Sequence, residues 1–525
     1  ITLALTRVGP PNFDVFQEAW PNNDRNLWFG IYDGVLYDVI EGGALVLKPS
    51  VASSWSMDDK ALTLKIRQDV PWHDTKYGNL TVDDIMFSWT RASAAGTKWT
   101  RADVFTTNWQ MDKMSAPDKE TIVLPWKTKD ARWATVLRDV ELNSKKQFDD
   151  KGADYQNVTG MGTGPFKLKA MVADDSMTLE AVPSHWRETS NVATVKAFQV
   201  PEEAARIAMI KTGEADVVQM GLQSAKAIDG LKGVRFFSGP VTGTTGAQIA
   251  LTGLYYQKTD FKGAPTNRVP LTKLQWVGDP AVTDPKSPKH MDNARKVRLA
   301  MAMSIDRESL VRNILAGQGA PQYIWNFGPG HPRWTPEIAK KYTIPYDVAG
   351  AKKLLAEAGY PNGFDFEFWI PSGLTDVLVN LCQAMVPMFQ AAGLNPKVSQ
   401  TAYTTVRPQL LARTIDKAWC WQENGWNLDP ANVLYRLNTI DVWNVGMEIG
   451  ETEPVYREIY AAPTVEERWK VIEGKFAPWY YDFLPGFQTV SFVNPIVLGP
   501  KIGDYPVRLF AESYPRDLWL LKLAQ

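Results

Sequence analysis

The sequence predicts an α/β protein with two or three domains. Segments that alternate apolar and polar residues, typical of strands, are interleaved along the chain with segments of helical periodicity. The chain of 525 residues is longer than one hydrophobic core usually supports, and 45% of the residues are hydrophobic. No uninterrupted apolar run of 18 residues, typical of a membrane-spanning helix, occurs in it. These features indicate a large multidomain globular protein.

The first part of the chain contains strand patterns followed by a well-marked helix. Leu62, Leu64 and Ile66 alternate with polar residues and predict a strand. Thr81 and Asp84 form a capping-box pair, which predicts the start of a helix because both side chains can bind free backbone N–H groups. The glycine-rich segment 160–164 is followed by a proline and a strand pattern, so it does not indicate a phosphate-binding loop.

Three helices are marked clearly in the middle of the chain. Pro201 in the first turn and Gly213 at the end predict one helix, and residues 215–218 then read as a short strand. Apolar spacing predicts two more helices over residues 347–359 and 375–393. Strands and helices therefore alternate through most of the sequence.

Composition and motifs exclude several classes of function. The chain carries 57 Lys and Arg against 58 Asp and Glu, a balance that does not attract nucleic acid or an anionic membrane. The four histidines show no metal-ligand spacing, and neither a nucleophile-elbow nor a P-loop motif occurs. We therefore expect no catalytic residues, no metal and no cofactor. A secreted glycosidase, whose two carboxylates only the fold would bring together, and a structural interaction module remain as alternatives.

Two features of the sequence bear on cellular location: the cysteines and the first residues. Cys382 and Cys420 are the only cysteines, and the sequence leaves open whether they pair. The chain begins without a basic segment, an apolar segment or a methionine. This fits a mature chain from which a signal peptide has been removed.

Tryptophan is unusually frequent, with 21 residues. Core packing explains most tryptophans, but an indole beside glycine and asparagine can also stack on a ligand. The densest group is residues 419–426, where Trp419, Trp421 and Trp426 occur within eight positions. Trp419 and Trp421 share one face if they lie on a strand, and that face can meet either ligand or core. We expect Trp426, flanked by glycine and asparagine, to lie in a loop.

Four blocks of sequence resemble the family 5 extracellular solute-binding proteins, the peptide/nickel-type receptors of ABC importers. The blocks follow one another in the family's order across most of the chain. They are IYDGVL (31–36) leading through residues 49–55, 64–74 and 81–89; GTGPFKL (162–168) leading to GEADVV (213–218); VRLAMAMSIDR (297–307); and AKKLLAEAGYP (351–361).

The resemblance implies an α/β fold of the periplasmic-binding-protein type (cluster C-like), with two lobes around a hinge and an extra subdomain in the first lobe. It implies the following division: residues 1–45 first lobe, 46–159 inserted subdomain, 160–245 first lobe, 246–483 second lobe, and 484–525 returning to the first lobe. The glycine-containing segment 238–246 would be one hinge crossing and residues near 483–490 the other.

The resemblance also implies a function without chemistry on the ligand. Such a receptor captures a small solute between the lobes and delivers it to the transmembrane subunits of an ABC permease. We expect a periplasmic monomer with no nucleic-acid partner. No cysteine that could accept a lipid lies near the first residue, which favours a free periplasmic protein.

The chain departs from the family's peptide-binding members where they bind the peptide's amino group. These members carry an aspartate a few residues before an Asp-Pro pair, and the pair here is Asp429-Pro430. Aligned without a gap, the amine-binding position holds Trp426. Glu423 could replace the missing acid from the same segment, and Asp429 either supplies an acceptor or braces a turn. In the first lobe, Trp20 and Asn22 fall where the family's chain runs beside the ligand.

These departures favour an oligosaccharide or another non-peptide solute over a peptide. The predicted ligand-binding residues are Trp20, Asn22, Trp419, Trp421, Glu423, Trp426 and Asp429. Indoles can stack on the C–H face of a sugar, and amides and carboxylates can bind its hydroxyl groups. A di- or oligopeptide is the main alternative, and an aromatic or cationic molecule could use the same indoles. A metal chelate or haem is a further alternative.

Overall fold

The computed structural model describes most of the 525 residues, and the following account is confined to them. The described residues are all except 10, 12, 15, 17–29, 42–43, 98, 100–101, 130, 238–243, 260–263, 283–289, 326, 373–374, 427–428, 433–437, 441–442, 493–495 and 506–517. Among the helices of this part of the chain, none is long and apolar enough to cross a membrane.

The chain divides into two compact units, and each of them is formed by more than one stretch of sequence. Unit 1 comprises Ile1–Gly239, Pro495–Arg508 and Glu512–Gln525, and unit 2 comprises Pro240–Asn494 and Leu509–Ala511. The chain leaves unit 1 within the predicted hinge segment 238–246, of which residues 238–243 lie outside the described part.

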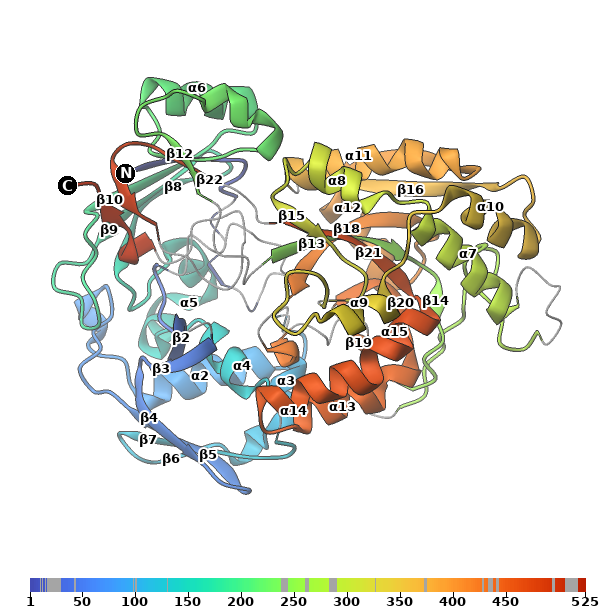
Figure 1. Cartoon of the computed structure of the whole chain (residues 1–525). Coiled ribbons are helices and arrows are strands. Elements are labelled where there is room, and N and C mark those ends of the chain that lie inside the picture. Colours follow the sequence, from blue (N-terminus) through green and yellow to red (C-terminus); the bar gives the residue numbers. More distant parts are fainter. Residues whose placement is uncertain are drawn as a thin grey trace. The chain divides into compact units, whose positions relative to one another are not determined.

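Unit 1 is organised around a seven-stranded mixed sheet of order β12-β22-β11-β1-β10-β9-β8 (Figure 1). Its strands are β1 (Thr2–Leu5), β8 (Phe166–Val172), β9 (Ser176–Ala181), β10 (Thr194–Gln199), β11 (Val217–Gln219), β12 (Arg235–Phe237) and β22 (Ile496–Leu498). Strand β1 lies parallel to both β10 and β11, and helix α6 (Glu203–Thr212) connects these two strands. Gly213 ends α6 with a φ of 77°, as its position in the sequence predicted.

A second sheet in unit 1 lies within the predicted inserted subdomain. It has the order β4-β5-β7-β6 and a core rich in tryptophan, including Trp72, Trp89 and Trp109. The capping box at Thr81 and Asp84 is confirmed at the start of α2. The elements are β4 (Ala52–Met57), β5 (Ala61–Ile66), α2 (Val82–Ser93), α3 (Ala102–Asn108), β6 (Ser115–Asp118), β7 (Thr121–Pro125), α4 (Trp133–Asp139) and α5 (Lys145–Thr159), preceded by a hairpin of β2 (Leu36–Glu41) and β3 (Ala44–Pro49).

Unit 2 contains a six-stranded sheet of order β15-β21-β13-β18-β16-β17. Strand β13 lies between β18 and β21 and is antiparallel to both, whereas β16 is parallel to β17 and β18. The strands are β13 (Thr244–Leu251), β15 (Gly319–Pro321), β16 (Phe364–Ser372), β17 (Leu394–Ala402), β18 (Ala418–Trp426) and β21 (Gly486–Phe492). A smaller sheet joins β14 (Leu254–Tyr255), β19 (Asn438–Ile440) and β20 (Trp443–Glu448).

The helices of unit 2 include both of the helices that the sequence predicted in this part of the chain. Helix α10 (Val348–Glu357) begins after Asp347, and α11 (Asp376–Ala391) begins after Thr375 and keeps Pro387 in its interior. In Figure 1, α11 runs alongside β16. The others are α7 (Met291–Met303), α8 (Arg307–Asn313), α9 (Pro336–Tyr342), α12 (Tyr403–Ala412), α13 (Glu453–Ala461), α14 (Val465–Val471) and α15 (Ala477–Phe483).

The end of the predicted second lobe requires a correction. Residues 484–525 were assigned to the first lobe, but β21 pairs with β13 and β15 and belongs to the sheet of unit 2. All seven β21 residues are buried, because the strand lies inside this sheet and not at its edge. The chain returns to unit 1 with β22, which pairs with β11 and β12.

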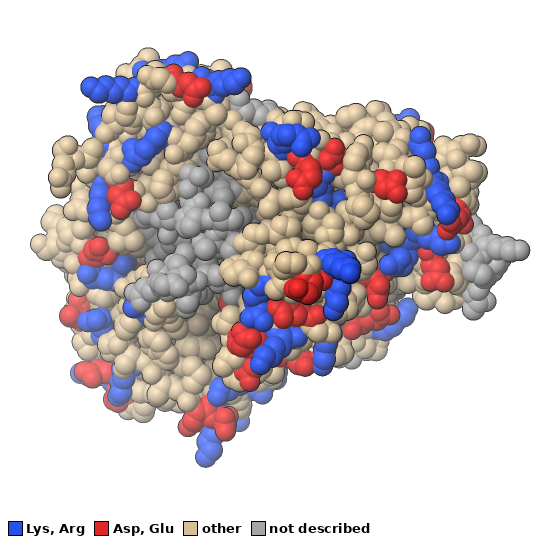
Figure 2. Space-filling model, viewed as in Figure 1, with Lys and Arg blue, Asp and Glu red and all other residues tan. Residues whose placement is uncertain are grey.

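The face of the molecule in Figure 2 carries charges of both signs. Figure 2 shows lysine and arginine interspersed with aspartate and glutamate on the face in view. With a net charge of −1, this distribution gives no reason to expect electrostatic attraction of a polyanion.

Candidate functional site

Strand β18 places the predicted residues Trp419 and Trp421 on one face of the unit 2 sheet. Because side chains alternate along a strand, Trp419 and Trp421 share one face, while Cys420 and Gln422 point to the other. This arrangement confirms the shared face that the sequence predicted for the two indoles. Trp419 lies opposite Ala250 of β13, and Trp421 lies opposite Gln248.

The first face carries a packed group of four aromatic rings. The Trp369 and Trp419 ring centroids are 4.8 Å apart, and the Trp419 and Trp421 centroids are 4.6 Å apart. Tyr403 is the first residue of α12, and its ring centroid lies 6.2 Å from that of Trp419 and 5.6 Å from that of Trp421. Trp419 is 0% exposed and Trp421 is 6% exposed. For Trp419, this is the packing expected of the core alternative.

A pair of buried amides lies beside these rings. Gln248 and Gln488 are each 1% exposed and occupy facing positions on β13 and β21. Gln488 Nε2 donates a hydrogen bond to Gln248 Oε1, and within the described part of the chain Gln248 Nε2 has no hydrogen-bond partner. Neither glutamine is predicted from the sequence, because a glutamine in an apolar strand does not by itself indicate a site.

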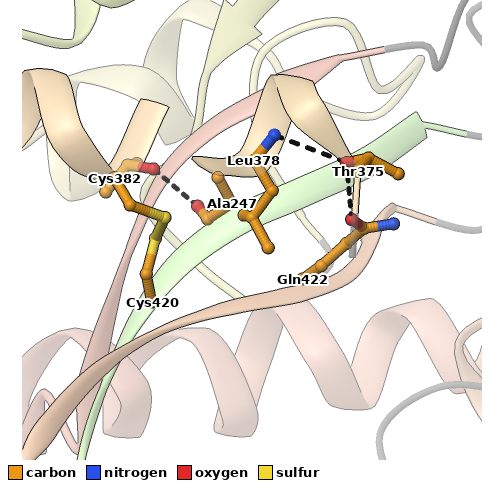
Figure 3. Close-up of a disulfide and its surroundings, with 7 residues drawn as sticks. Ala247, Thr375, Leu378, Cys382, Cys420 and Gln422 are labelled. Carbon is orange, nitrogen blue, oxygen red and sulfur yellow. Dashed lines mark hydrogen bonds between the residues drawn. A yellow bond between two sulfur atoms is a disulfide. The ribbon is translucent and has the colours of Figure 1, made fainter. Parts of the chain in front are cut away.

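The second face of β18 is fastened to α11. Cys382 of α11 and Cys420 of β18 form a disulfide, with their Cα atoms 6.0 Å apart, which answers the question of pairing that the sequence left open (Figure 3). Two residues further along β18, Gln422 Oε1 accepts a hydrogen bond of 3.0 Å from Thr375 Oγ1 at the start of α11 (Figure 3). These contacts fix the strand just before the segment that contains Glu423 and Trp426.

Asp429 is bound by an arginine that the sequence analysis did not identify. Arg468 donates from Nε and Nη2 to the two carboxylate oxygens of Asp429, each over 2.8 Å. Arg468 Nη1 also donates to Ala462 O, and Asp429 Oδ1 accepts from the backbone N–H of Ala431. Asp429 therefore braces a turn, which is one of the two roles predicted for it from the sequence. Arg468 is 39 positions away, so no local motif points to it.

Four of the predicted residues are described only in part or not at all. Trp20 and Asn22 lie outside the described residues. The backbone of Glu423 and Trp426 belongs to β18, and their side chains lie outside the described part. The loop predicted at Trp426 is wrong, because β18 continues to this residue, which pairs with Thr244 across an irregularity in the register.

The described residues contain no group of three or more His, Cys, Asp or Glu side chains that could hold a metal ion. Asp429 is bound to Arg468, and Cys382 and Cys420 are bound to each other. In unit 2, strand β18 therefore carries buried indoles on one face, beside the amides of Gln248 and Gln488, and a disulfide fastens its other face to α11.

Comparison with known proteins identifies the family and the fold. The model of the bacterial extracellular solute-binding proteins, family 5 (middle region), matches residues 46–444. The heme-binding protein A of Haemophilus influenzae is 23% identical over 88% of this chain and 82% of its own length. The periplasmic oligopeptide-binding protein OppA of the same organism is 23% identical over 98% and 92%.

Solved structures show the same fold over the whole chain. The periplasmic binding protein DppA of Helicobacter pylori, in complex with the peptide STSA, matches with a TM-score of 0.77 and 17% identity over 99% of this chain and 96% of its own. The binding protein AgaA of A. tumefaciens R10, in complex with agropinic acid, matches with a TM-score of 0.77 and 18% identity over 100% and 99%. The two-lobed α/β fold predicted from the sequence is thereby confirmed.

Proposed function

Because the chain belongs to family 5 of the bacterial extracellular solute-binding proteins, a family of ABC-importer receptors, we propose that its solute is a short peptide or a peptide-like molecule. The packing of Trp419 carries this proposal. The sugar hypothesis depended on several indole walls in the second lobe, and Trp419 is fully enclosed by Trp369, Tyr403 and Trp421. Stacking on a sugar needs an indole face that solvent can reach.

The relatives add support for a peptide. Besides OppA, a dipeptide-binding protein of Escherichia coli is 23% identical over 75% of this chain and 71% of its own length. A peptide needs backbone donors and acceptors and a partner for its amino group. An ammonium group without a carboxylate would lose several kcal/mol on leaving water. We propose that Glu423 supplies this carboxylate in place of the family's aspartate.

The proposed ligand contacts are therefore Trp426 and Glu423 from β18, with Trp20 and Asn22 from the first lobe. Asp429 acts through its ion pair with Arg468 and does not receive the ligand. The disulfide suits an oxidising compartment, which supports a periplasmic location, and we propose that the receptor acts as a monomer that hands its solute to an ABC permease.

Native mass spectrometry of the purified receptor tests the class of solute, because such receptors often retain ligand. We expect additional masses that disappear on partial unfolding and fragment into amino-acid residues. A ligand that fragments in hexose steps would favour the oligosaccharide alternative. Release of shortened products from any candidate oligosaccharide would contradict a receptor and favour the glycosidase alternative.

The role of Glu423 has a separate test. For a tripeptide such as Ala-Ala-Ala, the Glu423→Gln variant should bind at least ~10-fold more weakly, since an ammonium loses its charged partner. The N-acetylated tripeptide should bind both proteins equally. If the free and acetylated tripeptides bind the wild-type protein with the same affinity, Glu423 does not bind an amino group.

A further inference from the structure

Residues 162–164 of unit 1 lie between two of its hydrophobic cores. Met161 belongs to the core that contains Trp72, and Phe166 belongs to the core of the seven-stranded sheet. The segment packs directly on the backbone of residues 30–31. A Cβ atom on Gly162 would lie 2.1 Å from Ile31 O, and Gly164 N donates to Ile31 O over 2.9 Å. A side chain at Gly162 cannot be accommodated, so this segment connects the 46–159 subdomain to the main sheet through its backbone.

His73 binds this segment from the side of the subdomain. Its backbone N–H donates to Gly162 O over 3.0 Å. Its ring accepts the N–H of Gly162 at Nδ1 over 3.3 Å, and its Nε2 lies 2.7 Å from Gly164 O. Because a carbonyl only accepts and a backbone N–H only donates, the ring is neutral with its proton on Nε2. Both ring nitrogens are thus engaged.

His185 binds the same segment from the side of the main sheet. Its Nε2 lies 2.8 Å from Thr163 O. Its Nδ1 accepts the backbone N–H groups of Arg187 and Glu188 over 3.3 and 3.2 Å. A second proton on His73 must go to Nδ1, where it would face the backbone N–H of Gly162 and break the hydrogen bond that this group donates.

The charged groups around His73 do not offset this loss. Asp33 Oδ2 is 3.7 Å from His185 Nε2, which already carries a proton, and Asp33 Oδ1 is paired with Arg187 Nη2 over 2.6 Å. Asp33 favours a charged His73, whereas Lys167 and the neighbouring His185 oppose it. Arg67 and Arg187 both lie on the ring of Trp186 beside His185 and add positive charge. Burial, the largest influence, lowers the pKa of His73 to about 4.

We propose that His73 and His185 with residues 162–164 form a histidine latch that joins the 46–159 subdomain to the main sheet at neutral pH and opens in acid. The latch is a conformational device of the first unit, separate from solute binding. A histidine whose pKa is lowered by folding stabilises the folded form fully above its unfolded pKa. That stability is lost as the pH falls from about 6.5 toward 4.

Hydrogen exchange read by mass spectrometry tests the latch on the whole protein. Labelling times at pH 7 and pH 4 are matched for the intrinsic exchange rate, and the peptide that covers residues 160–166 is followed. We expect protection in this peptide to fall by roughly 100-fold at pH 4, the factor that the His73 shift implies. Peptides from β13 should not change comparably.

Two variants and one titration make the outcome decisive. Gln at position 73 retains a side-chain N–H for Gly164 O and does not titrate, so His73→Gln should lose most of the acid response. His290→Gln, which removes a histidine that caps α7 in unit 2, is the matched control and should respond like the wild type. If His73→Gln responds fully, or the wild type does not respond, the latch is refuted.

NMR titration of the wild-type histidines avoids the variants, and a His73 pKa near 6.5 or an Nδ1–H tautomer would equally refute it.

Discussion

The indole of Trp419 lies against that of Trp369, with ring centroids 4.8 Å apart and planes inclined by 21°. The two residues are register partners on the parallel strands β18 and β16, so the backbone pairing itself brings the rings together. Trp369 is held further by its Nε1–H, which donates to Thr401 O over 3.1 Å. Trp419 is therefore a structural residue, although its place in the sequence is next to the proposed ligand contacts.

Replacing Trp419 by alanine should destabilise the protein strongly. The substitution removes a fully buried indole from between Trp369, Tyr403 and Trp421, and such changes cost about 3–5 kcal/mol because a cavity remains. Chemical denaturation followed by circular dichroism measures the loss. Tyr346→Ala is the control, since this aromatic side chain is 51% exposed and should change the stability by less than about 0.5 kcal/mol. Equal losses in the two variants would contradict the core assignment.

The disulfide between Cys382 and Cys420 should contribute measurably to stability. Its cysteines are separated by 38 positions, and closing a loop of this length in the unfolded chain corresponds to at most about 4 kcal/mol in the chain-entropy estimate. We expect the Cys382→Ala, Cys420→Ala double variant to lose about 2–4 kcal/mol. Denaturation with and without a reducing agent measures this. The variant should be insensitive to the reducing agent, and a wild-type protein that is equally insensitive when unfolded would show that the bridge does not form.

The ion pair of Arg468 with Asp429 should contribute far more to the stability of the fold than the exposed ion pairs nearby. The side chains are only 7% and 13% exposed, so Arg468→Met leaves a carboxylate without its partner, at a cost of about 3–5 kcal/mol. Arg457→Met is the matched control from the neighbouring helix α13. Its pair with Glu453 is 64% and 31% exposed and should contribute about 0.3–0.5 kcal/mol.

A double variant separates the pair from the packing of the arginine stem. Adding Asp429→Asn to Arg468→Met should recover part of the loss, because the uncompensated charge is removed. If the two substitutions lower the free energy of unfolding additively, Asp429 and Arg468 act independently. Their ion pair would then not be what braces the turn.

Local features of this fold could be predicted from the sequence, and long-range ones could not. The Thr81 capping box and the end of α6 at Gly213 depend on residues within one or two helical turns. The partner of Asp429 lies 39 positions away, and strand β21 pairs with β13 more than 200 positions away. Such pairings depend on the whole sheet, so the spacing of residues along the chain does not indicate them.

The same limit explains the outcome for the tryptophan-rich segment. The alternation of β18 showed correctly that Trp419 and Trp421 share a face. Which partner covers that face depends on Trp369 from β16 and Tyr403 from α12, and nothing near residue 419 indicates either. The expected loop at Trp426 failed for a related reason, since pairing with β13 extends the strand through Gly425.

The pair of Asp33 and Arg187 predicts a loss of stability in acid that has the same sign as that of the histidine latch but occurs at lower pH. Burial, the largest single influence, would raise the pKa of Asp33, but Arg187, at 2.6 Å, and His185 together outweigh it and hold the pKa below the usual value. Stability from this carboxylate is present above the unfolded pKa of about 3.9 and is lost as the pH falls through the lower folded pKa.

Arg187→Met should reverse the direction of the Asp33 pKa shift. Without the arginine, burial raises the pKa of Asp33, and its carboxylate destabilises the folded protein near neutral pH. The stability difference from the wild type should therefore be largest near pH 7 and shrink below about pH 4. Denaturation across this range checks it, with Lys169→Met, from an exposed pair with Glu180, as the control. A difference that is constant with pH would mean that only the aromatic contacts of Arg187 matter.

Trp426 is the residue whose replacement should separate binding from stability. Its backbone pairs with Thr244 at the end of β18, and alanine preserves this pairing. If the indole stacks on the solute as we propose, Trp426→Ala should weaken binding by roughly 1–4 kcal/mol, the range from partial stacking to nearly full burial of one indole. Without ligand the denaturation midpoint should stay close to that of the wild type, unlike that of Trp419→Ala. Calorimetric titration with the ligand identified by mass spectrometry measures the first effect. A Trp426→Ala variant that loses stability yet keeps its affinity would place this indole in the core with Trp419, and the ligand would then have to be sought at other residues.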